Sequence, residues 1–461
     1  MSQFIRRIRL GVPAEDAYRW HSNCGAFERL NPPWERVEVV GRSGGLENGS
    51  TVDLRVMLGP LPLRWTARHA NVIPGRQFQD TQERGPFAKW EHTHRFEPDG
   101  PHACVLEDRV DYALPLGALG RIFGGAMVRS RLEKMFTYRH HVTQMDLNAM
   151  VKLNENARVL TVAVTGASGL VGSALIPLLT TGGHRVKRLV RKQNPGADEI
   201  QWDIDAGTID AGALEGVDAV VHLAGENIAG RWSDEKKRKI RESRVKGTRL
   251  LSSTLMKLKR RPQVLVSASA IGYYGETGAT AVDENGPLSP RYLGEVCKEW
   301  EAEAMAATQA GIRVVRARLG VVLTPRGGAL AKMLTPFKLC VGGIIGSGKQ
   351  YWSWVALEDV IGALQFAVLN PQIDGAMNVV APDAATNYEF TKTLGKVLGR
   401  PTIFPMPAFA ARLALGEMAD ELLLTSTRVV PKTLQQNGYA FRFPNLEDAL
   451  RHLLGKQPAV K

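Results

Sequence analysis

Three glycines carry the clearest chemistry in the sequence. Gly166, Gly169 and Gly172 are spaced three residues apart, directly after the apolar run 160–164. Between a strand and a helix, such glycines permit a tight turn, let a pyrophosphate approach the backbone, and let the helix pack closely on the strand. The N-terminus of the helix then offers unpaired N–H groups to the phosphates. The stretch predicts a dinucleotide-binding loop made of Gly166, Ser168, Gly169, Leu170, Val171 and Gly172.

A second group of residues bears on which dinucleotide binds. The segment 185–190 is typical of the next strand, and Arg191 and Lys192 follow it. An acidic residue at this position would accept hydrogen bonds from the ribose hydroxyls and favour NAD. Guanidinium donors instead match the oxygens of a 2′-phosphate. We therefore predict NADP as the cofactor, with Arg191 and Lys192 at the extra phosphate and Asp203, which ends a short third strand, at the adenine.

Small residues complete the predicted cofactor crevice at the end of a fourth strand, 219–223. Ala224 and Gly225 follow, and small side chains there let a cofactor pass over the strand tips. We assign Leu223, Ala224 and Gly225 to the cofactor, and the next two residues, Glu226 and Asn227, to a small-molecule substrate.

Composition limits the class of protein that must position these residues. With 461 residues the chain is too long for one core, so two or three domains are expected. No apolar run reaches membrane-spanning length, and the N-terminus lacks the apolar core of a signal peptide. The four cysteines are scattered and form no C-x-x-C pair, which favours reduced thiols in a cytoplasmic protein without membrane attachment.

The net charge of +13 raises the question of nucleic-acid binding. The excess is spread along the chain, and its one local concentration, 231–246, also contains acidic residues. No aromatic residues suited to stacking on bases are interleaved with these charges. We therefore expect a solvated helix face and no nucleic-acid partner.

The first 150 residues form a separate, Arg-rich module with only two lysines. A strand is predicted over 4–10 and a helix near 13–20, followed by short alternating segments separated by turn residues. These segments are 36–40, 51–57, 63–69, 77–82, 89–96 and 104–112. A long helix over 119–145 closes the module.

This order of elements resembles the helix-grip fold of the START-like and polyketide-cyclase-like superfamily. The resemblance implies an α+β domain that binds a hydrophobic small molecule, although a fold alone does not fix a function. His92 and His94 alternate onto one strand face, and His140 and His141 lie on the closing helix. Because the sequence shows no clear third ligand, we expect no metal site.

The remainder of the chain resembles the extended short-chain dehydrogenase/reductase superfamily. The matching motifs are T-G-A-S-G-L-V-G, H-L-A-G, S-A-S-A-I-G-Y-Y-G and R-L-G-V-V-L. The segments G-E-N-I-A-G-R-W-S and G-S-G-K-Q-Y-W-S-W-V resemble, more narrowly, an epimerase-like family with a short C-terminal domain. The resemblance covers about 160–454 and implies a doubly wound parallel sheet of the Rossmann type. The expected domains are therefore 1–150 (helix-grip), 159–400 (NADP-binding, α/β) and 401–461 (small helical cap).

The superfamily's proton relay is missing from this sequence. Relatives use Tyr-x-x-x-Lys on the helix after the fifth strand, where the lysine lowers the tyrosine pKa. Here the residue four after Tyr292 is Val296. Aligning Glu301 with the family's later acid instead places Leu293 and Cys297 at the two positions.

The resemblance nevertheless implies hydride exchange at a carbonyl or alcohol carbon. Ser269 matches the family serine that orients the substrate oxygen, and Tyr273 is our preferred proton donor, with Tyr274 or Glu226 as alternatives. Two other hypotheses remain open. The domain binds NADP without chemistry, as a sensor, or Cys297 acts as a nucleophile.

Overall fold

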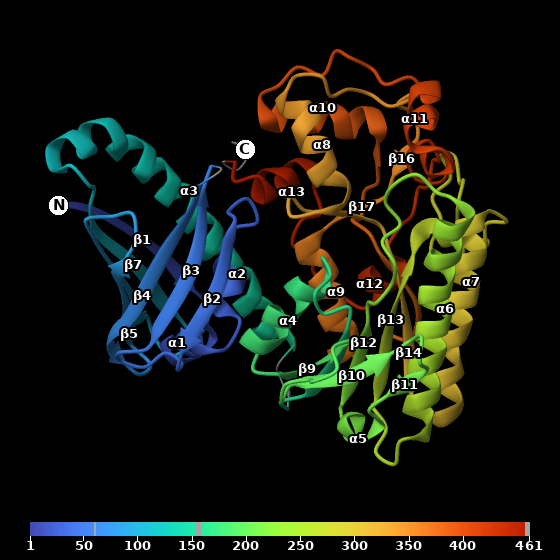
Figure 1. The fold of residues 1–461 in the computed structure, drawn as a ribbon, viewed down its shortest axis with the longest axis horizontal. Coiled ribbons are helices and arrows are strands. Elements are labelled where there is room, and N and C mark those ends of the chain that lie inside the picture. Colours follow the sequence, from blue (N-terminus) through green and yellow to red (C-terminus); the bar gives the residue numbers. More distant parts are fainter. Residues whose placement is uncertain (60, 154–157, 457–461) are drawn as a thin grey trace. The chain divides into compact units, whose positions relative to one another are not determined.

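The computed structural model describes residues 1–59, 61–153 and 158–456, and these fall into two compact units. The first is built mainly from the chain up to Leu153 and the second mainly from Arg158 to Leu453 (Figure 1). None of the helices in the described ranges has the length and apolar character needed to cross a bilayer.

The first unit is an antiparallel sheet of seven strands in the order β1-β7-β6-β5-β4-β3-β2. This confirms the strands predicted from the alternating pattern. Their bounds are β1 Ser2–Leu10, β2 Val37–Ser43, β3 Thr51–Leu58, β4 Leu61–Ile73, β5 Gln77–Arg84, β6 Lys89–Pro98 and β7 Cys104–Ala113. Only β1 lies out of sequence order, because it pairs with β7 rather than with β2.

The long helix α3 (Gly117–Leu153) follows the sheet, and two short helices, α1 (Ala14–Ser22) and α2 (Ala26–Leu30), come before β2. The predicted closing helix is confirmed but is longer than 119–145 at both ends. Leu132 and Phe136 of α3 pack with Phe4, Trp90 and Val110 of the sheet. This arrangement is consistent with the expected helix-grip fold.

The second unit is built on an eight-stranded sheet in the order β11-β10-β9-β8-β12-β13-β14-β18. All neighbours are parallel except the β10–β11 hairpin. The strands are β8 Thr161–Thr165, β9 Arg185–Val190, β10 Glu199–Asp203, β11 Thr208–Ile209, β12 Ala219–His222, β13 Val264–Ala270, β14 Arg313–Leu319 and β18 Gly375–Val379. The strand order reverses between β8 and β12, the switch point where doubly wound sheets bind ligands, and the predicted Rossmann-type fold is confirmed.

Alternate residues of the central strand enter two separate cores. Val162 and Val164 of β8 pack with residues of α4 (Gly172–Thr181) and α9 (Leu357–Leu369). Ala163, between them, packs with residues of α6 (Asp234–Lys257). This explains why the strand is apolar throughout, since both faces are covered by helices.

The remaining helices of the second unit are α5 Ala211–Leu214, α7 Tyr292–Met305, α8 Gly328–Lys338, α10 Asn387–Leu398, α11 Ala408–Leu415, α12 Lys432–Gln436 and α13 Leu446–Leu453. Shorter helical turns are η1 Ile271–Tyr273, η2 Ala306–Ala310 and η3 Ala419–Leu423. Short paired strands are β15 Val321–Leu323, β16 Tyr351–Trp352, β17 Trp354–Ala356 and β19 Ala385–Thr386.

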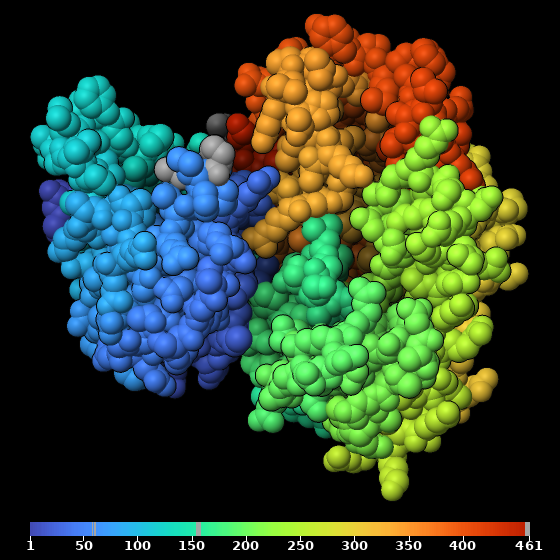
Figure 2. Space-filling model, in the orientation of Figure 1, coloured from blue at the N-terminus to red at the C-terminus, as the bar shows by residue number. Residues whose placement is uncertain are grey.

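The C-terminal residues pack back onto the second unit near the carboxyl ends of its strands. The Gly230 amide lies 3.3 Å from Met418 Sδ, and Arg231 donates to the Leu413 carbonyl at 3.3 Å. Figure 2 shows the orange-red residues around α11 beside the yellow-green residues that follow β12. The segment expected to form a helical cap thus lies against the loop that carries the predicted substrate residues.

Candidate functional site

The glycine-rich loop between β8 and α4 is held by close main-chain contacts. Gly166 has a φ of 66°, and a Cβ there would lie 2.8 Å from the Leu223 carbonyl and 2.9 Å from the Ala224 nitrogen. A Cβ on Gly172 would collide with the Gly166 carbonyl oxygen. These two glycines therefore allow β8, β12 and α4 to meet at a distance that no side chain tolerates.

The amides at the start of α4 are open to a ligand. Among the described residues, the backbone N–H groups of Leu170, Val171 and Gly172 have no hydrogen-bond acceptor. Ser168 and Gly169 are exposed beside them. Unpaired N–H groups at the start of a helix bind anions, because they lie at the positive end of the helix dipole.

A buried polar chain aligns the ends of β8 and β12. Thr165 Oγ1 accepts from the amides of Leu223 and Ala224 at 3.0 and 3.1 Å, so its proton is left to donate to His222 Nδ1 at 2.7 Å. His222 Nε2 then donates to Thr248 Oγ1 at 2.9 Å. Burial, together with the charge of Arg244, lowers the pKa of His222 to about 4, so this histidine is neutral.

The cations after β9 differ in their surroundings. Glu199 of β10 forms ion pairs with Arg188, at 3.1 Å, and with Lys192. Arg191 is exposed and forms no ion pair or hydrogen bond among the described residues. Asp203 accepts the amides of Asp205 and Ala206 at 2.9 and 3.0 Å, so its carboxylate caps a turn at the end of β10.

The residues after β12 pass beside a half-buried guanidinium. A Cβ on Gly225 would lie 3.3 Å from Arg244 Cζ, and Arg244 donates to the Glu226 carbonyl at 3.1 Å. The Glu226 carboxylate pairs with Lys236 at 2.5 Å, and Asn227 Oδ1 accepts the Ala229 amide at 2.9 Å. Lys236 holds the pKa of Glu226 below its ordinary value, which disfavours Glu226 as a proton donor.

Arg244 was not singled out by sequence reasoning, which placed 231–246 on a solvated helix face. Most charges there do pair at the surface, as Lys239 does with Glu235 and Arg241 with Glu299. Arg244 differs because its guanidinium lies 5.1 Å from the centre of the Trp300 ring. Its place one turn after Ile240, on the buried side of α6, was the only available signal.

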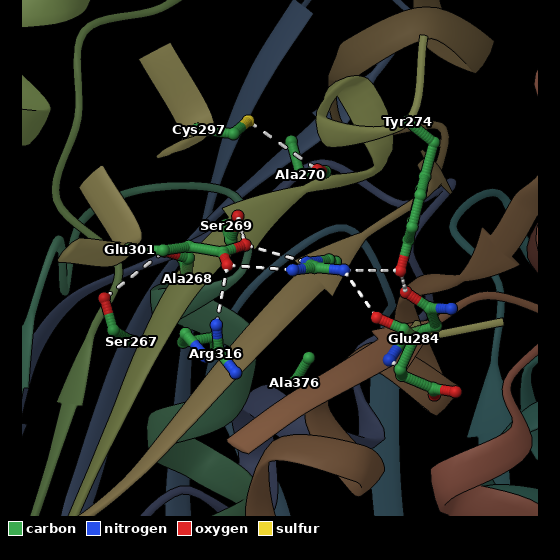
Figure 3. Close-up of polar contacts among 12 residues, drawn as sticks. Ser267, Ala268, Ser269, Ala270, Tyr274, Glu284, Cys297, Glu301, Arg316 and Ala376 are labelled. Carbon is green, nitrogen blue, oxygen red and sulfur yellow. Dashed lines mark hydrogen bonds and ion pairs between the residues drawn. The ribbon is translucent and has the colours of Figure 1, made fainter. Parts of the chain in front are cut away.

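A network of buried charges lies at the carboxyl ends of β13, β14 and β18 (Figure 3). Glu301 of α7 accepts from Arg318 at 2.8 and 2.9 Å and from Arg316 at 3.2 Å. Ser269 donates to the same carboxylate at 2.7 Å and is only 2% exposed. The Ser269 hydroxyl is therefore oriented by Glu301 rather than free to rotate.

The two tyrosines after β13 have different roles in this network. Tyr274 is buried, donates to Asn378 Oδ1 at 2.7 Å and accepts from Arg318 at 2.7 Å. Burial raises the pKa of Tyr274 to about 12. The Tyr273 ring lies over Arg318, with its centre 3.5 Å from Cζ, and its hydroxyl has no partner among the described residues.

Helix α7 shows what replaces the family's Tyr-x-x-x-Lys. Cys297 Sγ lies 3.7 Å from the Ala270 carbonyl oxygen, and Leu293 contacts the position a Cβ would take on Gly272. Both therefore face the end of β13, whereas Tyr292 donates to the Lys237 carbonyl at 2.6 Å. Burial raises the pKa of the Cys297 thiol to about 11, which keeps it protonated and unreactive near neutral pH.

Comparison with protein families matches three parts of the chain. The NAD dependent epimerase/dehydratase family matches residues 162–380. The polyketide cyclase / dehydrase and lipid transport family matches residues 10–136, and a domain of unknown function matches residues 406–453. Both resemblances drawn from the sequence are thereby confirmed.

Individual relatives match either the whole of this chain or about two thirds of it. An epimerase family protein of Mycobacterium bovis is 43% identical over 290 residues, which cover 63% of this chain and 96% of that protein. The crystal structure of a nucleoside-diphosphate sugar epimerase from Corynebacterium glutamicum has 31% identity and a TM-score of 0.82, covering 99% of this chain and 91% of that one. The human epimerase family protein SDR39U1, crystallised with NADPH, has 35% identity and a TM-score of 0.59, covering 64% and 99%.

The buried network makes a prediction about stability. Glu301→Gln leaves the guanidinium of Arg318 buried without a carboxylate, so we expect the free energy of unfolding to fall by about 3 to 5 kcal/mol. Urea denaturation of the full chain measures this. Glu299→Gln is the matched control on the same helix, because its pair with Arg241 is solvent-accessible and contributes less than about 1 kcal/mol. Equal effects of the two substitutions would contradict the prediction.

Proposed function

Because the chain belongs to the NAD dependent epimerase/dehydratase family, we propose that its second unit binds NADP(H) and exchanges hydride with a small carbonyl or alcohol substrate. The first unit, in this proposal, binds a hydrophobic small molecule, as its match to the polyketide cyclase and lipid transport family suggests. The observation that carries the proposal is the set of unpaired amides of Leu170, Val171 and Gly172 at the switch point of the sheet.

Three features support the cofactor residues. The open amides donate hydrogen bonds to the pyrophosphate, and the exposed neighbours Ser168 and Gly169 border it. Arg191, after the end of β9, has no ion-pair partner among the described residues and binds the 2′-phosphate. Lys192 also lies there but forms an ion pair with Glu199. The human relative was solved with NADPH, which agrees with this choice.

A side chain of the protein supplies the proton that the substrate oxygen gains when the carbonyl is reduced. When bound, the reduced nicotinamide supplies a hydride to the substrate carbon. Tyr273 donates the proton to the substrate oxygen, since its hydroxyl is unpaired, whereas that of Tyr274 is held by Asn378 and Arg318. The Arg318 guanidinium packs against the Tyr273 ring and so holds the phenol in place.

Ser269 and Arg244 position the reacting groups in this proposal. The Ser269 hydroxyl, fixed by Glu301, orients the substrate oxygen. Arg244 brings a positive charge close to Cys297, where relatives are expected to carry the lysine, and so compensates in part for its absence. Leu223, Ala224 and Gly225 border the nicotinamide, and Glu226 and Asn227 border the substrate.

The choice of cofactor is tested by Arg191→Ala. Losing a charge-assisted hydrogen bond of about 1.5 to 3 kcal/mol should raise the dissociation constant for NADPH roughly ten- to hundredfold. The constant for NADH should not change, because NADH has no 2′-phosphate. Fluorescence titration of both nucleotides measures the effect, and Arg185→Ala, at the opposite end of β9, is the control. Equal weakening for both nucleotides would contradict the assignment.

The proton donor is tested by Tyr273→Phe. A panel of aldehydes and ketones is first presented to the NADPH-loaded protein, and consumption of NADPH is followed. With any compound that is turned over, Tyr273→Phe should reduce the rate about a hundredfold or more without weakening NADPH binding. Tyr274→Phe should lower the melting temperature but leave turnover per folded molecule largely unchanged. Turnover of no compound by the wild-type protein would favour the sensor hypothesis instead.

The role of Ser269 is tested separately by Ser269→Ala. The Ser269 proton is given to Glu301, so its oxygen can orient an alcohol substrate only by accepting from the substrate hydroxyl. Removing this acceptor should lower turnover about a hundredfold. NADPH affinity should be unaffected, because Glu301 keeps its pairs with Arg318 and Arg316. Unchanged turnover would remove Ser269 from the site.

A further inference from the structure

The interior of the first unit gathers ionisable side chains that the proposed hydride transfer does not use. Asp80 of β5 lies directly opposite His92 of β6, and Phe78 lies opposite His94. Because residues two apart share a face of the sheet, Asp80, His92 and His94 point to the same side. One potential ligand atom from each of these three residues lies within 4.8 Å of the other two.

A second carboxylate orients the two imidazoles. Asp108 Oδ1 lies 2.8 Å from His92 Nε2 and 2.7 Å from His94 Nδ1, and its Oδ2 lies 2.6 Å from His140 Nε2 of α3. Histidines that bind metals usually have the other ring nitrogen held by a carboxylate, as Asp108 holds His92 Nε2. The opposite ring nitrogen of each is thereby left for a ligand.

The distance between His94 and Asp80 suits two side chains that bind the same metal ion. His94 Nε2 and Asp80 Oδ2 are 3.7 Å apart, too far for a hydrogen bond. Two atoms that each bind one zinc ion at about 2.0 to 2.2 Å are separated by up to about 4 Å. The other oxygen of Asp80 is held by His69 Nδ1 at 2.6 Å, which fixes the carboxylate.

The protein's own hydrogen bonds do not fully satisfy the cluster. His94 is 5% exposed, and its Nδ1 approaches Asp108 without the alignment of a hydrogen bond.

We propose that the first unit binds one divalent first-row transition-metal ion through Asp80, His92 and His94. Two imidazole nitrogens and one carboxylate oxygen suit zinc, cobalt or iron(II), whereas calcium and magnesium prefer oxygen ligands alone. Asp108 and His69 orient the ligands. Asp80 is about a quarter exposed at its side chain, so an ion enters from its side. This is the one such group among the residues described.

The test uses the full chain, stripped of metal with a chelator and then titrated. We expect one equivalent of Zn²⁺ by calorimetry, one equivalent of Co²⁺ by its visible absorption, and a rise in melting temperature with either ion. Asp80→Asn and His94→Gln should each weaken binding at least tenfold. His102→Gln is the control, because this exposed histidine in the β6–β7 loop is absent from the cluster.

Asp80→Asn is the decisive variant if His94→Gln fails to fold, since the Asp80 side chain reaches solvent. Near-ultraviolet circular dichroism checks that its fold is kept. Absence of saturable binding by the wild-type chain would overturn the proposal. The histidines and carboxylates would then form a hydrogen-bonded network without a metal ion. Binding that survives Asp80→Asn undiminished, or that is lost with His102→Gln, would also overturn it, because the ion would then lie elsewhere.

Discussion

The second unit depends on a main-chain contact at the switch point of its sheet. Gly166 lies so close to the backbone of Leu223 and Ala224 that a Cβ would overlap them, and Thr165 ties the same two amides by hydrogen bonds. With β8 and β12 joined in this way, α4 starts where its first amides face outward. The predicted cofactor residues are thus brought to one edge of the sheet by a steric constraint and not by side-chain recognition.

Buried carboxylates organise the polar interior of both units. In the second unit, Glu301 gathers Arg318, Arg316 and Ser269. In the first, Asp108 gathers three histidines. Burying an anion costs free energy unless several hydrogen-bond donors surround it. Each carboxylate therefore fixes the geometry of the side chains that donate to it. Such fixed geometry is what a binding site needs, because flexible groups lose more entropy when they bind.

Helix α7 lacks the family's Tyr-x-x-x-Lys, and other side chains lie at the end of β13 instead. Leu293 and Cys297 occupy the face of α7 where the pair would stand, and Arg244 from α6 lies close by. Tyr273, stacked on Arg318, keeps an unpaired phenol in the same unit. Two arginine guanidinium groups thus lie near the end of β13, where α7 carries no Tyr-x-x-x-Lys pair.

The sequence by itself determined the elements and their order. Alternation of apolar and polar residues predicted the seven antiparallel strands, because a strand buried on one face alternates in this way. Continuous apolar runs followed by glycines predicted the parallel sheet, because its strands are buried on both faces. The glycine motif and the missing lysine are also local in sequence. Contacts between distant residues were decided by the tertiary structure alone. Three contacts depend on strand register and helix packing, which composition and spacing do not encode. They are the pairing of Ser269 with Glu301, the packing of Arg244 on Trp300, and the approach of Asp80 to His92 and His94.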